Sequence, residues 1–215
     1  MKRVLIIANG ELDPGMAPRL ASLPVDRLIA VDGGAGHCRS LGLVPDLVIG
    51  DLDSLTPETL EHVVRAGVTL ERHPARKDET DLELALGNAL RQGAEYIVLA
   101  CALGGRLDMT LANVLFLARP EFRDIRIELW EARRTTWLLR PPGGEIHGFQ
   151  GDTLSLIPLQ GDAEGVVTEG LAYPLRAETL RFGQARGLSN VFTGTHAWVR
   201  LRGGMLLVVH TSGRA

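Results

Sequence analysis

Residues 45–54 read Pro-Asp-Leu-Val-Ile-Gly-Asp-Leu-Asp-Ser, so a short apolar run is followed by a glycine and two closely spaced aspartates. Such a run, bounded by turn residues, is typical of a strand buried on both faces of a parallel sheet. Asp51 and Asp53 follow it in i, i+2 relation. In extended chain these carboxylates point to the same side, about 7 Å apart, and a divalent metal can bind between them. The alternative is a turn whose Asp and Ser side chains cap the next helix.

Similar apolar runs and helical patterns alternate through the first two thirds of the chain. The expected strands cover 3–8, 28–31, 47–49, 96–100 and 125–129. The expected helices cover 57–66, 81–92 and 107–118. This alternation predicts an α/β domain with a mainly parallel, Rossmann-like sheet. Sheets of this kind bind ligands at the carboxyl ends of their strands.

The pattern changes at residues 140–144, which read Arg-Pro-Pro-Gly-Gly. Short extended segments separated by turns follow, over 153–158, 165–168, 187–193, 197–201 and 205–210. They predict a small all-β sandwich. We therefore expect an α/β domain over residues 1–139 and a β domain over residues 140–215. A β domain of this size needs a packing partner, which is its own α/β domain, a second chain, or both.

Composition excludes several classes of protein. The chain has 215 residues, 45% of them hydrophobic and 23% charged, and a formal net charge of -3. This balance gives no reason to expect nucleic acid or an anionic membrane as a partner. The first apolar run is too short for a secretory signal, and no run approaches the length of a membrane span. Cys38 and Cys101 show no metal-ligand spacing, which predicts buried, reduced thiols in a cytoplasmic protein.

Lysine is rare in this chain. Of the 23 basic residues, 21 are Arg, and the two lysines are Lys2 and Lys77. A compact ammonium group suits a phosphate oxygen or a crowded carboxylate cluster, which gives Lys77 a possible phosphate role. Thr80 and Glu83, a few residues further on, have the spacing of a helix capping box, which explains them without any function.

Two glycine-rich turns open expected helices. Backbone amides at such turns can hold phosphate, although neither turn matches a familiar nucleotide fingerprint. The alternative for each is a tight strand-to-helix connection. Arg106, beside the second turn, is a natural phosphate clamp. The two turns are Asp32-Gly33-Gly34-Ala35-Gly36 and Leu103-Gly104-Gly105-Arg106-Leu107-Asp108.

Several aspartates lie near strand ends or helix starts, which a doubly wound sheet brings to one edge. Carboxylates that converge there repel one another unless a cation binds, and Mg²⁺ is the expected ion for hard oxygen ligands. Together with Lys77, Arg106 and the glycine turns, they predict phosphoryl or pyrophosphoryl transfer. These aspartates are Asp32, Asp51, Asp53, Asp81 and Asp108.

These segments together resemble the thiamine pyrophosphokinase (thiamine diphosphokinase) family. The resemblance covers about residues 6–118, and a weaker match, Gly-Leu-Ser-Asn, lies at 187–190. It implies an α/β nucleotide-binding catalytic domain followed by a β-sandwich that binds thiamine and forms a homodimer. It also implies Mg²⁺-dependent transfer of pyrophosphate from ATP to the thiamine hydroxyl, giving thiamine diphosphate and AMP. The matching segments are 32–35, 45–46, 50–54, 77–83, 85–86, 103–108 and 111–113.

By this resemblance, particular residues take particular roles. The implied Mg²⁺ ligands are Asp51, Asp53 and Asp81, which form the catalytic set together with Lys77 and Asp108. The implied ATP and phosphate site comprises Asp32, Gly33, Gly34, Lys77, Asp78, Thr80, Gly104, Gly105 and Arg106. Ser189 and Asn190 are expected to contact thiamine.

The chain also departs from the family. Met109 stands where the family commonly has His or Gln, and Val191 stands where bacterial members often have Glu. Trp198 and Phe192 are the candidate aromatic partners of the thiamine ring, and packing in the core or on a sheet face is the alternative for each. These departures concern the thiamine half of the site rather than the ATP half.

Two other functions fit part of the pattern. Asp51 and Asp53 imitate the nucleophile motif of haloacid-dehalogenase-like phosphatases, in which Asp51 would be phosphorylated. In that family, however, the motif normally ends the first strand of the domain, whereas here it follows the third. The other alternative is a nucleotide-sensing module that binds ATP without turnover.

Overall fold

The computed structural model describes residues 1–213 and divides the chain into two compact units. The first, the α/β unit, is Met1–Ala132, and the second, the β unit, begins at Arg133. The division falls a few residues before the expected boundary at 139/140. Strand β7 (Arg134–Leu139) lies in the β unit because it pairs with β14 (Leu206–Thr211). None of the helices in residues 1–213 is both long and apolar enough to cross a bilayer.

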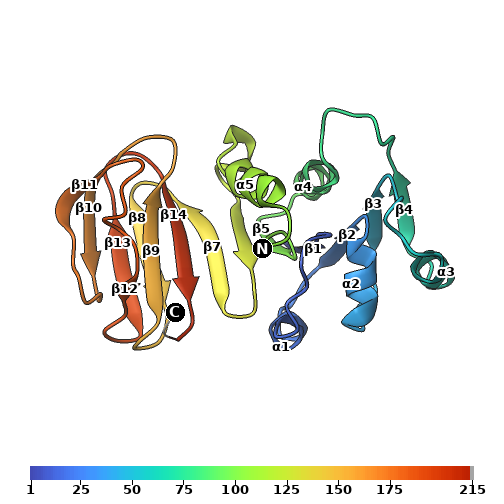
Figure 1. Cartoon of the computed structure of the whole chain (residues 1–215), viewed down its shortest axis with the longest axis horizontal. Coiled ribbons are helices and arrows are strands. Elements are labelled where there is room, and N and C mark those ends of the chain that lie inside the picture. The colour runs from blue at the N-terminus through green and yellow to red at the C-terminus, as the bar shows by residue number, and fades with distance from the viewer. Residues whose placement is uncertain (214–215) are drawn as a thin grey trace. The chain divides into compact units, whose positions relative to one another are not determined.

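The α/β unit contains the expected parallel sheet with intervening helices (Figure 1). Its strands lie in the order β6-β5-β1-β2-β3-β4, and each neighbouring pair is parallel. The strands are β1 (Arg3–Ile7), β2 (Arg27–Val31), β3 (Leu47–Gly50), β4 (Thr69–Arg72), β5 (Tyr96–Ala100) and β6 (Arg126–Trp130). The helices are α1 (Met16–Ala21), α2 (Gly34–Ser40), α3 (Pro57–Arg65), α4 (Asp81–Arg91), α5 (Leu107–Phe116) and the short 3₁₀ helix η1 (Pro120–Phe122).

The starts of α3 and α4 are set by local sequence. Thr56 caps α3 by accepting a hydrogen bond from the Thr59 backbone, and proline follows at the first helical position. Thr80 and Glu83 form the expected capping box at the start of α4. Both caps satisfy backbone N–H groups that a helix start leaves without partners. The capping box therefore fixes where Asp81, the first residue of α4, stands relative to the sheet.

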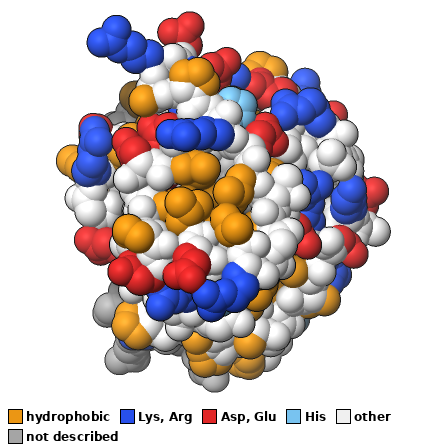
Figure 2. All heavy atoms as spheres, turned by 90° about the vertical axis from the view of Figure 1, so that its right-hand side faces the viewer, with side chains coloured by type: hydrophobic (Ala, Val, Ile, Leu, Met, Phe, Trp, Pro, Cys, Tyr) orange, Lys and Arg blue, Asp and Glu red, His pale blue; other side chains and the backbone are white. Residues whose placement is uncertain are grey.

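Helix α3 and the edge strand β4 form one face of the α/β unit. Figure 2 shows hydrophobic side chains gathered near the centre of this face, with charged side chains around them. Leu60 and Val64 of α3 are exposed, whereas Thr59 and Val63 are buried. Helix α3 thus buries the side that carries Thr59 and Val63, while apolar side chains also remain on its solvent-exposed surface.

The β unit consists of two groups of antiparallel strands that share one hydrophobic core. One group has the order β12-β9-β14-β7 and the other β11-β10-β13-β8. Leu154, Leu206, Val166 and Val199 contribute to the shared core from strands of both groups, so that each group buries one face. The strands not yet named are β8 (Gly143–His147), β9 (Thr153–Pro158), β10 (Ala163–Glu169), β11 (Arg176–Leu180), β12 (Asn190–Val191) and β13 (His196–Arg200).

Both cysteines are buried free thiols in the core of the α/β unit, as predicted. Burial disfavours the thiolate, which raises the pKa of Cys38 to about 12 and that of Cys101 to about 11. At neutral pH both side chains are therefore protonated and unreactive.

Asp152 anchors the turn that leads into β9, the strand on which β12 pairs. Asp152 is 2% exposed, and its carboxylate accepts hydrogen bonds from Phe149 N at 2.9 Å, Gly213 N at 2.7 Å and His210 Nε2 at 2.9 Å. Burial alone disfavours the charged carboxylate. The three hydrogen bonds outweigh that effect, so the pKa of Asp152 lies below its ordinary value.

Asp152→Asn is expected to lower the free energy of unfolding by about 1–3 kcal/mol at neutral pH, because a neutral amide accepts these bonds less well. Because the pKa of Asp152 is lower in the folded protein, its charged carboxylate stabilises the fold at pH values above the pKa of about 4 that it has in the unfolded chain. This stabilisation is lost as the pH falls through the pKa of Asp152 in the folded protein. Urea denaturation of both proteins between pH 7 and pH 3 measures this. A difference that does not shrink at low pH contradicts a role for the charged carboxylate.

Candidate active site

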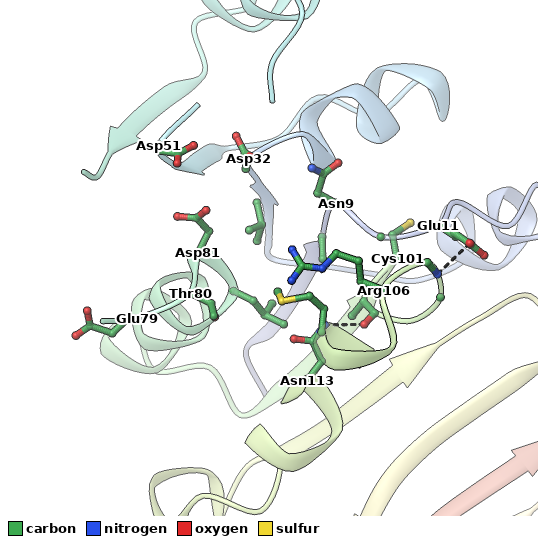
Figure 3. Close-up of a pocket in the computed structure, with 18 of the residues that line it drawn as sticks. Asn9, Glu11, Asp32, Asp51, Glu79, Thr80, Asp81, Cys101, Arg106 and Asn113 are labelled. Atoms are coloured by element: carbon green, nitrogen blue, oxygen red, sulfur yellow. Dashed lines mark hydrogen bonds between the residues drawn. The ribbon is translucent and has the colours of Figure 1, made fainter. Parts of the chain in front are cut away.

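A pocket of about 610 Å³ lies in the α/β unit, at the carboxyl ends of the parallel strands (Figure 3). Asn9, Asp32, Asp51 and Cys101, which line it, follow β1, β2, β3 and β5. The start of α4 and the turn before α5 complete the wall. The expected site residues that line it are Asp32, Asp51, Lys77, Thr80, Asp81, Gly104, Gly105 and Arg106.

Three aspartates converge beside this pocket. Asp32, Asp51 and Asp53 each offer an oxygen that lies within 4.8 Å of the other two. Asp32 is 8% exposed, and its Oδ1 is buried without a hydrogen-bond partner in residues 1–213. A buried carboxylate oxygen without a partner is unfavourable, and a bound cation would satisfy it. The hard oxygen donors of this cluster therefore fit Mg²⁺.

Gly50 allows the aspartates to approach one another. Its φ of 148° lies in the region that favours glycine. A Cβ atom at Gly50 would lie 3.1 Å from the Cβ of Asp32 and 3.2 Å from the Cγ of Asp81. A side chain there would push these two residues apart. In Figure 3, the side chains of Asp32, Asp51 and Asp81 lie near one another at one end of the pocket.

The structure arranges the acidic residues differently from the sequence expectation. Asp81 was expected to bind the metal together with Asp51 and Asp53, and this role stays a prediction; the carboxylates that lie within 4.8 Å of one another are those of Asp32, Asp51 and Asp53. Asp81 lines the same pocket, but its Oδ1 lies 2.9 Å from Lys77 Nζ. The Lys77 side chain is 13% exposed and also donates to the carbonyl of Pro74 at 3.0 Å. Lys77 is thus a partly buried ammonium group held at the pocket wall.

The segment around Lys77 contains other expected residues with local roles. The Thr80 hydroxyl accepts from Glu83 N at 3.2 Å, and Glu83 Oε2 accepts from Thr80 N at 2.8 Å. Thr80 therefore uses its oxygen as a helix cap while its side chain lines the pocket. Asp78 is not among the residues that line this pocket, whereas its neighbour Glu79 is.

The first glycine turn is explained by close packing. A Cβ at Gly33 would lie 2.3 Å from Asn9 Oδ1, and one at Gly34 would lie 2.2 Å from the carbonyl oxygen of Ile7. Only glycine lets α2 begin this close to the end of β1. Asp32, directly before this turn, has a φ of 47°, which is rare for a residue with a side chain. The turn thus positions Asp32 rather than lining this pocket itself.

The second glycine turn presents Arg106 to the pocket. Gly104 and Gly105 have positive φ angles of 85° and 65°. Arg106 Nε donates to Asp108 Oδ1 at 3.1 Å, and a second guanidinium nitrogen donates to the other carboxylate oxygen. This side-chain bonding, together with the Met109 backbone, holds the pKa of Asp108 below its usual range. Asp108 is therefore an ionised partner of the guanidinium.

The β unit places Ser189 and Asn190 in different environments. Ser189 is exposed with a φ of 54°, and its backbone N–H donates to Ser155. Asn190 is buried, and its side chain bonds both backbone groups of Tyr173, accepting from its N–H at 2.9 Å and donating to its carbonyl at 2.7 Å. The amide of Asn190 thus holds the Tyr173 backbone against β12.

The aromatic candidates in the β unit differ in exposure. Phe192 lies in the core, 1% exposed, so its side chain packs there and is not available to a ligand. Trp198 is 37% exposed on β13 and lies under the guanidinium of Arg200. Tyr173, which the sequence did not single out, is 65% exposed. Asn9, Glu11 and Glu79 were also missed, although Asn9 and Glu11 follow the end of the first strand, where site residues are expected.

Comparisons with known proteins match both units of the chain to the same family. A family model described as thiamin pyrophosphokinase, catalytic domain, matches residues 24–129, and one described as thiamin pyrophosphokinase, vitamin B1 binding domain, matches residues 144–206. Thiamine pyrophosphokinase from Bacillus subtilis is 26% identical over 215 residues, which cover 99% of this chain and 100% of the relative. Thiamine pyrophosphokinase 1 from Oryza sativa is 29% identical over 202 residues, covering 81% and 76%.

Solved structures agree with these matches. The crystal structure of the Bacillus subtilis thiamine pyrophosphokinase superimposes with a TM-score of 0.89 at 25% identity, covering 98% of this chain and 99% of that one. The thiamin pyrophosphokinase from Geobacillus thermodenitrificans superimposes with a TM-score of 0.83 at 26% identity, covering 98% and 97%. The likeness therefore extends over the α/β unit and the β unit alike.

Proposed function

The chain belongs to the thiamine pyrophosphokinase family, whose activity forms thiamine diphosphate, and we propose that it transfers the pyrophosphoryl group of ATP to thiamine with Mg²⁺ at the aspartate cluster. The convergence of Asp32, Asp51 and Asp53 beside Lys77 is the observation that carries this proposal. The α/β unit, with a Rossmann-like sheet, is the nucleotide-binding part and the β unit the thiamine-binding part. In this proposal the enzyme is a homodimer.

The reaction transfers a pyrophosphoryl group. The thiamine hydroxyl attacks the β-phosphorus of ATP, a new O–P bond forms as the hydroxyl loses its proton to solvent, and the bond to the α-phosphate oxygen breaks, so that AMP leaves. Negative charge grows on the phosphate oxygens, and fixed positive charge stabilises it. Mg²⁺, when bound, neutralises part of this charge.

The chain's own residues hold and orient the reacting groups. Asp51 and Asp53 are placed to hold the cation, and Asp32 supplies the buried oxygen that needs one. Lys77, from the segment before α4, and Arg106, from the second glycine turn, supply positive charge at the pocket wall. Lys77, whose side chain is only 13% exposed, is held by Asp81, so its position is set before substrate arrives, as electrostatic preorganisation requires. Arg106 pairs with Asp108 on the exposed surface and is free to reorient toward a phosphate.

A direct assay tests this proposal. The protein is incubated with ATP, Mg²⁺ and thiamine, and AMP and thiamine diphosphate are measured. We expect equal amounts of the two products, each dependent on all three components. No AMP above the thiamine-free control would contradict the proposal and favour a nucleotide-sensing module. Inorganic phosphate release without thiamine, with a phosphoryl group trapped on Asp51, would favour a phosphatase.

Tyr173 is our candidate for the aromatic contact to thiamine. Its side chain is 65% exposed, while its backbone is held on both sides by the buried amide of Asn190. An exposed aromatic side chain on fixed backbone is suited to stack on a flat, cationic ligand such as thiamine. Ser189, which the family resemblance assigns to thiamine, directly precedes Asn190 in the chain.

Tyr173→Ala is expected to raise the KM for thiamine about tenfold with little change in the KM for ATP, since a stacked or cation–π contact contributes about 1–1.5 kcal/mol. Tyr173→Phe keeps the ring and should restore the wild-type KM. Trp198→Ala, which removes another exposed aromatic of the same unit, is the matched control. Equal effects of Tyr173→Ala and Trp198→Ala on the thiamine KM would argue against a specific contact.

A further inference from the structure

Glu11 contacts the second glycine turn, where the proposed function places phosphate. Its Oε1 accepts a hydrogen bond from Gly105 N at 2.9 Å, which Figure 3 marks by a dashed line. Its Oε2 lies 2.7 Å from the position that a Cβ of Gly104 would occupy. A carboxylate thus lies against the turn and uses a backbone N–H that could otherwise bind an anion.

The backbone that carries Glu11 is held in place. Gly10 N donates to the carbonyl of Cys101 at 2.7 Å, and the Gly10 carbonyl lies 2.8 Å from His37 Nε2. A Cβ at Gly10 would lie 2.4 Å from that same Cys101 oxygen, so glycine is needed for this close approach. These contacts fix the loop after β1 and direct Glu11 toward the turn.

The two basic side chains of the pocket have carboxylate partners, as the Gly105 amide does. Lys77 pairs with Asp81, and Arg106 pairs with Asp108. Asp81 and Asp108 already have places in the proposed site, as a pocket acid and as the partner that orients Arg106. Glu11 has no such place. Its negative charge beside a polyphosphate would be repulsive unless it is displaced when phosphate binds.

We propose that Glu11 competes with a phosphate oxygen of the nucleotide for the amide of Gly105 and thereby lowers the affinity of the site for ATP. This inference rests on the proposed use of the second glycine turn for phosphate. A phosphate oxygen that bonds Gly105 N must replace the Glu11 carboxylate there. Glu11 is exposed, so the displaced side chain has solvent to enter.

Glu11→Gln tests the competition, with Asp13→Asn as a matched control. Each change removes one negative charge from the same loop and keeps a side-chain acceptor. Asp13 accepts from Gly15 N at 2.9 Å, within its own loop rather than on the glycine turn. The Kd of ATP with Mg²⁺ is measured by calorimetry without thiamine. We expect Glu11→Gln to bind ATP about fivefold more tightly, because a neutral amide is a weaker competitor than a carboxylate.

For Asp13→Asn we expect a change in Kd of less than about twofold. Equal tightening in both variants would overturn the proposal, since it would show only a long-range charge effect. Unchanged or weaker ATP binding by Glu11→Gln would also overturn the proposal. Weaker binding would indicate that Glu11 stabilises the second glycine turn in the conformation that binds ATP. Failure of the wild-type protein to bind ATP would instead overturn the nucleotide site, and this inference with it.

Discussion

Asp51→Asn is expected to lower kcat/KM by about a thousandfold or more and at the same time to raise the stability of the metal-free protein slightly. Asp51 belongs to the cluster in which three carboxylate oxygens lie within 4.8 Å of one another. Loss of a metal ligand removes charge stabilisation that acts mainly in the transition state, which accounts for the large effect on rate. Asn keeps the oxygen that accepts a hydrogen bond from Asp53 N, so the turn should survive.

The expected gain in stability has an electrostatic cause. Without a cation the clustered carboxylates repel one another, and removing one charge should raise the free energy of unfolding by about 0.5–1 kcal/mol. Urea denaturation in EDTA measures this gain. Adding Mg²⁺ should then stabilise the wild-type protein more than Asp51→Asn, because the ion binds only the folded cluster.

Asp124→Asn serves as the control, since Asp124 is exposed and does not line the pocket. It should change neither activity nor the response to Mg²⁺. If Asp51→Asn kept activity within about tenfold of wild type, its metal role would be wrong. If it were less stable than wild type in EDTA, the carboxylates would not repel one another as the geometry implies.

The sequence predicted well those strands and helices that depend mainly on the residues within them. The buried apolar runs predicted the strands β1, β2, β3, β5 and β6, since strands covered on both faces carry continuous apolar residues. The edge strand β4, Thr69–Arg72, was not predicted, because it is partly exposed and reads Thr-Leu-Glu-Arg. Strand β7 was not predicted, and its residues were placed in the first domain because sequence does not show that they pair with β14.

The site was predictable as a set of residues but not as a set of contacts. The position of Asp51 after a buried strand was visible, whereas the approach of Asp32 depends on the spacing of two neighbouring strands. The contact of Asn190 with thiamine stays a prediction, and sequence did not show that its amide bonds a backbone 17 residues away. Tyr173 carried no signal, because side-chain exposure depends on how neighbouring strands pack. Such long-range pairings arise only when the whole chain folds.

Lys77→Arg is expected to lower kcat/KM for ATP about 10–100-fold, although it conserves charge. The Lys77 ammonium fits between Asp81 Oδ1 at 2.9 Å and the Pro74 carbonyl at 3.0 Å, and the side chain is 13% exposed. A guanidinium is larger and planar, and it cannot occupy this space without moving Asp81 or leaving the wall. A displacement of about 1 Å in a phosphate-positioning group is enough to cost this much.

Lys2→Arg provides a matched control because it is the same substitution at the chain's other lysine. Lys2 donates to the carbonyl of Gln92 on the exposed surface and does not line the pocket. Steady-state kinetics should show no change for Lys2→Arg and an unchanged thiamine KM for Lys77→Arg. Wild-type ATP use by Lys77→Arg would mean that any cation suffices there. The single interior lysine among 21 arginines would then have no functional cause.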